Sequence, residues 1–334
     1  MVRFGCLGAA RITPGALIAP AKKHSGAEVV AIASRSAERA GDFAGEHGIA
    51  AIETDYAALI KRPDVDAIYN ALPPHRHADL TIMALEAGKP VLCEKPMAMN
   101  ADEAARMAEA AKRTGTLLME AFHYRFHPVF AQAVEIVRGG DLGRVQTYEG
   151  HFSVEIPERD GELRHELALG GGALMDLGCY PLHWARSLLE GEPEIISAKS
   201  VTGREGIDVS TRAEMVFDGG VKAHITTSMA PSVKFEAWLQ VTGSDGSLRI
   251  QNPLAPHLGH RVTLLPVGSD EPIIVAEEGP SKETTYDFQL DHFLKCLSGE
   301  AEPILPPGDG VANMAAIDAI YKAAGMAPRG AGES

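Results

Sequence analysis

Val91-Leu92-Cys93-Glu94-Lys95-Pro96 is a short apolar run that ends in a charged pair and a proline. We predict a buried strand here, because the run is apolar and Pro96 cannot continue the strand. Open α/β sheets bind their ligands in the crevice at the carboxyl ends of their strands. Lys95 is therefore a candidate for ligand contact, although a surface lysine in a strand-to-helix loop would give the same pattern.

Similar apolar runs alternate with helical segments on both sides of this stretch. The six predicted strands are Val2–Leu7, Glu28–Ala33, Ile49–Thr54, Val65–Leu72, Val91–Cys93 and Thr116–Phe122. Such alternation predicts an α/β fold with a parallel doubly wound sheet of the Rossmann type. After Lys95, Asn100 is placed to cap a helix and Glu103 follows three residues later. We expect a dinucleotide-binding domain over residues 1–123.

The turn after the first strand carries a partial phosphate-binding fingerprint. It reads Gly8-Ala9-Ala10-Arg11-Ile12-Thr13 and leads into a helical segment, so backbone N–H groups could face a pyrophosphate. Only Gly8 matches the pattern G-x-G-x-x-G, since Ala10 and Thr13 replace the other two glycines. A tight structural turn would look the same. We also expect cofactor contacts where later strands end, at Leu72, Pro73, Glu94 and Lys95. His77 is a candidate to cap its helix or to contact the cofactor.

The second strand ends in Ser34-Arg35-Ser36, and Arg39 follows four residues after Arg35. A site for NAD usually carries Asp or Glu at this point to hold the ribose 2′-hydroxyl. A hydroxyl group and guanidinium groups suit a 2′-phosphate instead. We therefore predict NADP as the cofactor, with Ser34, Arg35 and Arg39 around its phosphate, and NAD as the alternative. The competing interpretation is a solvated helix start with Arg39 on its outer face.

The alternation stops after His123, and the second half has a different pattern. A helix is predicted at about 129–137, a strand at 145–152, a long loop at 153–172, and mostly strands from about 194 to 276. Helices return at about 287–297 and 311–324. We expect an α+β domain over residues 124–334, with a large and mostly antiparallel open sheet. The last helix is a candidate to pack back on the first domain.

One helical segment of the second half combines three groups that can handle protons. It begins at Gly170-Gly171-Gly172 and carries Asp176, Tyr180 and His183, which share a helix face. An acid, a phenol and an imidazole on one face are a plausible set for acid–base chemistry. A polar cluster at a domain interface would look the same.

Composition limits the classes of partner. The net charge is −14, which argues against nucleic acid and anionic membrane surfaces. The four cysteines are far apart and lack the Cys/His spacing of zinc sites, so we expect free thiols, no metal and a cytoplasmic setting. Gly8 interrupts the first apolar run too early for a secretory signal, and no segment has the roughly 20 apolar residues of a membrane span.

Glu94-Lys95-Pro96 after a strand, together with Asp176-x-Gly178-x-Tyr180 on a later helix, resembles the Gfo/Idh/MocA oxidoreductases over nearly the whole chain. Ser34-Arg35, Glu120-Ala121-Phe122 and the tyrosine at 180 are similar to the NADP-dependent branch with dihydrodiol dehydrogenase and D-xylose 1-dehydrogenase. Ala10 and Thr13 depart from the glycine fingerprint. The resemblance implies an oligomer, such as a homodimer or homotetramer, formed through the open sheet of the second domain.

The resemblance also implies a reaction, which is hydride transfer between NADP and a sugar, polyol or cyclic diol, or the matching keto compound. Tyr180 would exchange a proton with the substrate oxygen, Lys95 would assist with its charge, and Asp176 would hold a second hydroxyl. Further candidates for the substrate wall are Arg125, Phe152, Arg164 and His183. Two alternatives remain open: a glycoside hydrolase that retains NAD, and a non-catalytic NADP-binding regulator.

Overall fold

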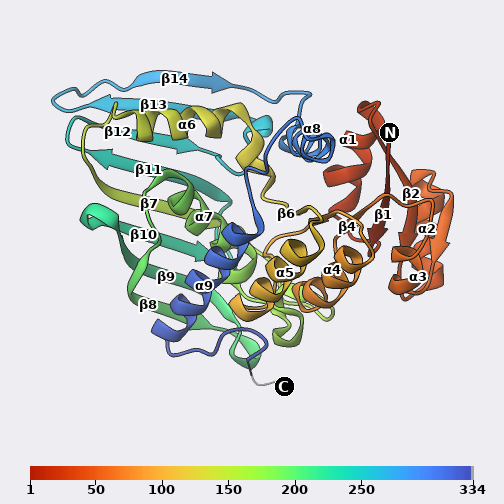
Figure 1. Cartoon of the computed structure of the whole chain (residues 1–334). Coiled ribbons are helices and arrows are strands. Elements are labelled where there is room, and N and C mark those ends of the chain that lie inside the picture. The colour runs from red at the N-terminus through yellow and green to blue at the C-terminus, as the bar shows by residue number, and fades with distance from the viewer. Residues whose placement is uncertain (332–334) are drawn as a thin grey trace. The chain divides into compact units, whose positions relative to one another are not determined.

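The computed structural model describes residues 1–331 and divides into two compact units (Figure 1). One unit comprises Met1–His123 with Tyr286–Met314, and the other comprises Tyr124–Thr285 with the residues from Ala315 onward. The first unit holds a six-stranded parallel sheet in the order β3-β2-β1-β4-β5-β6. Its strands are β1 (Val2–Leu7), β2 (Ala27–Ala33), β3 (Ala51–Glu53), β4 (Ala67–Asn70), β5 (Val91–Cys93) and β6 (Leu118–Glu120). The predicted doubly wound sheet is thus confirmed, and its order reverses between β1 and β4, where such sheets bind ligands.

Three of the helices between these strands begin at side-chain caps that the sequence supplies. Ser36 caps α2, Asp55 caps α3, and Asn100 caps α5 by accepting a hydrogen bond from the Glu103 N–H at 3.0 Å. The predicted cap at Asn100 is confirmed. The helical elements up to residue 123 are η1 (Pro14–Ile18), α1 (Ala19–Lys23), α2 (Ala37–His47), α3 (Tyr56–Ile60), η2 (Pro74–Arg76), α4 (His77–Glu86) and α5 (Ala101–Thr114).

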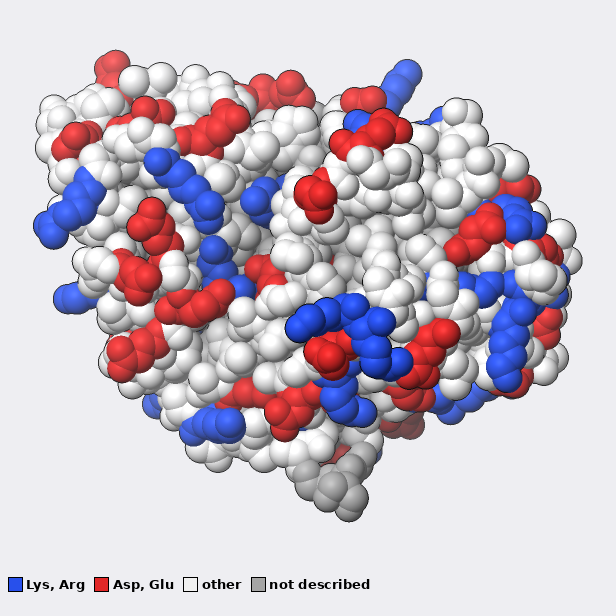
Figure 2. All heavy atoms as spheres, in the orientation of Figure 1, with Lys and Arg blue, Asp and Glu red and all other residues white. Residues whose placement is uncertain are grey.

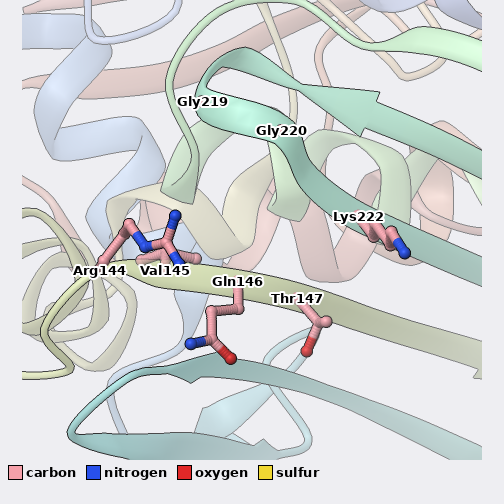
Figure 3. Close-up of a pocket in the computed structure, with 7 residues that line it drawn as sticks. All are labelled: Arg144, Val145, Gln146, Thr147, Gly219, Gly220 and Lys222. Carbon is pink, nitrogen blue, oxygen red and sulfur yellow. The ribbon is translucent and has the colours of Figure 1, made fainter.

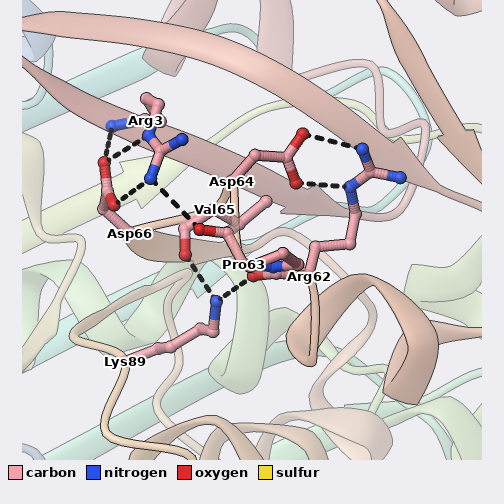
Figure 4. A network of polar contacts seen from close by, with 7 residues as sticks. All are labelled: Arg3, Arg62, Pro63, Asp64, Val65, Asp66 and Lys89. Atoms are coloured by element: carbon pink, nitrogen blue, oxygen red, sulfur yellow. Dashed lines mark hydrogen bonds and ion pairs between the residues drawn. The ribbon is translucent and has the colours of Figure 1, made fainter.

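A polar network joins residues at the amino-terminal ends of the strands, opposite the carboxyl ends where such sheets bind ligands (Figure 4). The Arg3 guanidinium donates to both carboxylate oxygens of Asp66, at 2.9 and 2.8 Å. The hydrogen bond from Arg3 lowers the pKa of Asp66. The Lys89 ammonium donates to the carbonyl oxygens of Arg62 and Val65. These contacts tie the start of β1 to the segment before β4.

The helix α8 (Thr285–Ser298) belongs to the first unit from Tyr286 onward. Phe293 is fully buried and its ring centroid lies 5.9 Å from that of Phe4 in β1. Lys23 pairs with Asp287 at 2.7 Å. The domain expected over residues 124–334 differs from this grouping, which also takes in the start of α9 (Pro307–Ala323). The helix α8 groups with the first unit because its Phe293 packs against Phe4 of β1.

The second unit holds an eight-stranded sheet in the order β14-β13-β12-β11-β7-β10-β9-β8. β7 and β10 are parallel neighbours, and all the other pairs are antiparallel. Its strands are β7 (Val145–Ser153), β8 (Glu194–Thr202), β9 (Asp208–Phe217), β10 (Val221–Ser228), β11 (Glu236–Gly243), β12 (Gly246–Gln251), β13 (His260–Pro266) and β14 (Ile273–Glu278). Buried and exposed residues alternate along β10, so one face of the sheet is covered and the other is open. The large, mostly antiparallel sheet is as predicted.

Helices cover the buried face of this sheet. Besides α6 (Pro128–Gly139), α7 (Cys179–Leu188) and the later part of α9, the short helical elements are η3 (His123–Phe126), η4 (Leu163–His165), η5 (Leu167–Leu169), η6 (Leu174–Gly178), η7 (Arg204–Gly206), η8 (Asp218–Gly220) and η9 (Pro256–Leu258). The predicted helical segment after Gly172 forms as a π-helical turn, η6, that continues into α7. Pro181 lies in the first turn of α7, and its carbonyl accepts a hydrogen bond from the Tyr148 hydroxyl of β7 at 2.8 Å.

Candidate active site

The turn after β1 is shaped for close approach of a ligand. Gly8 has φ +95°, and a Cβ atom there would lie 3.0 Å from Cδ2 of Leu72. Thr13 is fully buried, and its hydroxyl has no hydrogen-bond partner within residues 1–331. Arg11 and Ile12 are exposed. A turn with a spare buried hydroxyl at the start of a helical segment fits the pyrophosphate of a dinucleotide.

The end of β2 offers a hydroxyl and two cations. Ser34 is buried and its hydroxyl accepts a hydrogen bond from the Ser36 N–H at 3.4 Å. Arg35 is exposed, and Nη2 of Arg39 donates to the carbonyl of Ala9 at 3.2 Å. Arg39 therefore links the start of α2 to the turn after β1. The arrangement fits a 2′-phosphate, because a guanidinium that spends one donor on Ala9 retains others.

His77 bridges the two loops that follow β4 and β5. Its Nε2 lies 2.6 Å from the Leu72 carbonyl oxygen and its Nδ1 lies 3.0 Å from the Pro96 carbonyl oxygen. The side chain therefore does not cap α4. Burial lowers the pKa of His77 to about 4, against the opposing effect of the backbone carbonyls. The ring ties the loop after Lys95 to the loop that holds Leu72 and Pro73, and direct contact with the cofactor stays a prediction.

In the charged pair after β5, the carboxylate of Glu94 is oriented by a tyrosine. The Tyr69 hydroxyl of β4 donates to Oε1 of Glu94 at 2.6 Å. Burial raises the pKa of Tyr69, and the negative charge of Glu94 adds to the effect. The backbone N–H of Lys95 donates to Oε2 of Glu94 at 3.3 Å, and the Lys95 side chain is half-buried. Glu94 thus holds the backbone from which the Lys95 side chain projects.

In the second unit, Asp176 pairs with Arg164. Nε of Arg164 donates to Oδ2 of Asp176 at 2.7 Å, and Nη1 donates to Oε1 of Glu162 at 2.9 Å. The charge of Asp176 is the main reason that the pKa of Arg164 is raised. The Glu162 side chain is only 2% exposed. Arg164, expected in the substrate wall, thus holds the carboxylate that we expected to bind substrate.

Tyr180 lies in an aromatic cluster. Its ring centroid is 5.8 Å from that of Phe152, in a T-shaped arrangement, and 6.1 Å from that of Tyr124. His183 is fully buried, and its Nδ1 lies 2.5 Å from the Tyr124 hydroxyl. The structure therefore brings Tyr180 and Phe152 together and turns His183 towards Tyr124. The Arg125 guanidinium lies 5.5 Å from the Phe130 ring centroid, on α6.

Sequence reasoning missed Tyr124 and two residues further along the chain. Tyr124 stands directly after His123, where the predicted βα alternation stops, and that position was the available signal. Asp208 and Arg329 form a buried ion pair at 2.5 Å behind the helix that carries Asp176. Neither residue lies in a recognisable motif, so no local signal pointed to them.

A hollow of about 240 Å³ elsewhere in the second unit has a different character (Figure 3). It lies where β7 begins and β9 turns into β10, lined mainly by Arg144, Gln146, Thr147, Gly219, Gly220 and Lys222. Its lining contains neither an acid nor an aromatic group, so it lacks the carboxylate and the phenol of the candidate site. Figure 2 shows acidic and basic side chains interspersed over the visible face of the molecule.

Within residues 1–331, no three His, Cys, Asp or Glu side chains are grouped so that they could hold a metal ion. No helix in this range is long and apolar enough to cross a membrane.

Two family models match the chain in succession. The first, described as the oxidoreductase family with an NAD-binding Rossmann fold, matches residues 2–122, and the second, the GFO/IDH/MocA C-terminal domain, matches residues 130–249. The chain belongs to the Gfo/Idh/MocA family of oxidoreductases, which confirms the resemblance seen in the sequence.

Three individual proteins are similar to this chain over most of its length. The chain is 33% identical over 323 residues to D-xylose 1-dehydrogenase (NADP(+)) 2 of Haloferax volcanii, covering 96% of this chain and 97% of the relative. It is 31% identical over 300 residues to trans-1,2-dihydrobenzene-1,2-diol dehydrogenase of Xenopus tropicalis, covering 88% and 89%. A 3-ketoreductase from Actinomadura kijaniata, solved with NADP and TDP-benzene, has a TM-score of 0.87 at 28% identity, covering 96% and 97% of the two chains.

Proposed function

We propose that this protein is an NADP-dependent dehydrogenase or reductase acting on CH–OH groups, and that its substrate is a sugar, a polyol, a cyclic diol or the matching keto compound. The observation that carries the proposal is the pair Asp176 and Tyr180 on one helix, with Arg164 holding the Asp176 carboxylate at 2.7 Å. The relatives named as dehydrogenases and reductases, and the NADP complex among the similar structures, support the reaction class and the cofactor.

Binding of NADP falls to the turn after β1 and the end of β2. Gly8 lets the backbone approach the pyrophosphate, and the buried Thr13 hydroxyl supplies a spare donor. Ser34 and Arg35 hold the 2′-phosphate, and Arg39 fixes the turn through the Ala9 carbonyl. When bound, the nicotinamide ring supplies the carbon that accepts or releases hydride.

Proton transfer falls to Tyr180. Its phenol gives a proton to the substrate oxygen in the direction of reduction and takes one in the direction of oxidation. A free phenol ionises near pH 10, so a nearby positive charge is needed for this role at neutral pH. We assign that charge to Lys95. Asp176 binds a second substrate hydroxyl as an acceptor, since Arg164 keeps its carboxylate paired with a cation.

The direct test is to follow the reduced nicotinamide by absorbance with purified protein. NADP⁺ and NAD⁺ are offered with a panel of aldoses, inositols and cyclic diols, and NADPH is offered with keto sugars. We expect turnover with at least one substrate and a preference for the phosphorylated cofactor. Cofactor that stays bound without net turnover across both panels would contradict the proposal and favour the hydrolase or the regulator.

The open face of the eight-stranded sheet supports the proposed homodimer or homotetramer. On it, the Trp238 ring stacks on His151 with centroids 5.6 Å apart, and the Arg249 guanidinium lies 4.3 Å from the Trp238 ring centroid. Aromatic and arginine side chains are the types enriched where protein surfaces meet. Light scattering should give a mass that is a multiple of the monomer, and Trp238→Asp should reduce it. A monomer at assay concentration would rule the oligomer out.

Cys6, Cys93, Cys179 and Cys296 are free thiols, which supports the proposed reducing, cytoplasmic setting.

A further inference from the structure

The helix that carries Asp176 and Tyr180 is capped by a residue from another element. Its N-cap residue is Ala173, whose methyl group cannot accept a hydrogen bond, and Gly170-Gly171-Gly172 precede it. The first backbone N–H, of Leu174, donates instead to Oδ2 of Asp208 in β9 at 2.7 Å. A carboxylate at the start of a helix satisfies one of its free N–H groups and interacts favourably with its dipole. Asp208 therefore acts as the cap of this helix.

Asp208 is fully buried and receives hydrogen bonds from four groups. They are the Leu174 N–H at 2.7 Å, the Thr211 hydroxyl at 3.1 Å, the Tyr321 hydroxyl at 2.9 Å and the Arg329 guanidinium at 2.5 Å. Burial raises the pKa of Asp208, and Arg329 opposes that shift. Because all four partners act as donors, the carboxylate form suits this position. One cation, Arg329, balances its charge.

Arg329 connects Asp208 to the glycine turn before the helix. Its Nη2 binds Asp208, and its Nε donates to the carbonyl of Gly171 at 2.7 Å. The guanidinium also lies 4.2 Å from the ring centroid of Tyr321, in α9. A single planar group thus fixes the turn on one side and the capping carboxylate on the other. These contacts use two different nitrogens of one rigid group, whereas a lysine would offer a single nitrogen on a flexible stem.

Gly172 is required by the closeness of this ion pair. A Cβ atom at Gly172, where φ is +134°, would lie 2.2 Å from Oδ1 of Asp208 and 2.8 Å from Nη2 of Arg329. The Gly172 N–H donates to the carbonyl of Arg164 at 2.9 Å. The same turn therefore fixes the backbone of Arg164, whose side chain binds Asp176. The glycine turn therefore positions both the helix and Arg164, which binds the carboxylate of Asp176 on that helix.

We propose that Arg329 is a positioning residue for the active site: through Asp208 and the Gly171 carbonyl it sets the place of the helix that carries Asp176 and Tyr180. The proposal rests on the proposed function for the roles of those two residues. It assigns to a residue of the C-terminal segment, outside both family-model matches, a part in the rate of the reaction.

The first test compares Arg329→Met and Arg329→Lys with a matched control, Arg261→Met. Arg261 belongs to an exposed ion pair with Glu277 at the sheet rim, in the same unit. Turnover is divided by the number of NADPH-binding sites, so that misfolded molecules are not counted. We expect kcat per site to fall about 10- to 100-fold in both Arg329 variants, the range for a displaced catalytic group. NADPH affinity should stay within about twofold, and the control should match the wild type. An unchanged kcat per site, with only fewer active molecules, would overturn the proposal.

A second readout does not depend on activity. Hydrogen exchange of the peptide spanning residues 172–188 should be faster in Arg329→Lys than in the wild type, while the peptides of β1 and β4 stay unchanged. Equal exchange in residues 172–188 would overturn the proposal even if kcat had fallen. Faster exchange in a protein that is inactive with every substrate would uphold the positioning and refute the proposed function instead. If Arg329→Met does not fold, Arg329→Lys carries both measurements.

Discussion

The carboxylate of Asp176 and the guanidinium of Arg164 are joined by a hydrogen bond of 2.7 Å, and the same guanidinium binds the buried Glu162. Arg164 therefore lies between two carboxylates, of which one is buried and the other belongs to the proposed substrate site. Its removal would affect both stability and substrate binding, and these two effects can be separated.

Arg164→Met should raise the substrate KM about tenfold, because Asp176 loses a group that orients it. It should also lower the melting temperature, because the buried Glu162 keeps only the longer ion pair with the exposed Arg159, at 3.5 Å. In Glu162→Gln with Arg164→Met the stability should recover, since no buried charge remains, while the high KM persists. Michaelis kinetics and thermal unfolding of the two variants check this. Recovery of KM together with stability would show that Arg164 has only a structural role.

Tyr180→Phe should lower kcat by about 10²- to 10⁴-fold, the range for losing a general acid–base group. Phenylalanine keeps the ring contacts with Phe152 and Tyr124, so folding and NADPH binding should be preserved. Stopped-flow and steady-state rates, with NADPH fluorescence as the control, measure the loss. Turnover close to that of the wild type would move the proton role to another residue, and His183 would be the next to test.

Arg35→Ala should raise the KM for NADP about 10- to 100-fold, as expected for the loss of a hydrogen bond to a charged phosphate. The KM for NAD should hardly change, because NAD lacks that phosphate. The measurement is the ratio of kcat/KM for the two cofactors. The matched control is Arg113→Ala. Arg113 lies on α5 and forms an exposed ion pair with Glu86 of α4. Equal effects of Arg35→Ala on both cofactors would contradict the phosphate assignment.

Stability should fall as the pH drops from about 6.5 towards 4. Burial lowers the pKa of His77 to about 4, so between these values the unfolded chain binds a proton that the folded protein does not, and stability rises with pH. The pKa of His127 is lowered to about 4 by burial in the same way. Between pH 7 and 5 His77 should account for about 2 kcal/mol. Urea unfolding should show that His77→Gln loses a pH dependence of about this size, and an unaltered pH slope would count against the assignment.

Local signals predicted the strands and helices of the first unit. Val2–Leu7 is β1 as expected, and Asn100 caps α5. Both could be predicted because an apolar run and a helix cap depend on residues that are close in the sequence. Long-range pairs could not be predicted. Asp208 and Arg329 are 121 positions apart, and Tyr124 and His183 are 59 apart. Such partners are chosen by the packing of whole elements. His77, expected as a cap or cofactor contact, does not cap α4, and one of its partners is the carbonyl of Pro96, 19 positions away. Its contact with the cofactor stays a prediction.

The packing of Phe293 on Phe4 has a consequence for synthesis of the chain. Phe4 stands in the central strand of the first unit, and the ring beside it comes from a helix made only after the whole eight-stranded sheet. During translation, part of the apolar core of the amino-terminal unit therefore stays exposed until α8 has left the ribosome. A fragment ending at residue 123 would keep that apolar surface permanently exposed and should aggregate. The cofactor-binding unit, although it is begun first, is thus completed only after the whole eight-stranded sheet has been made.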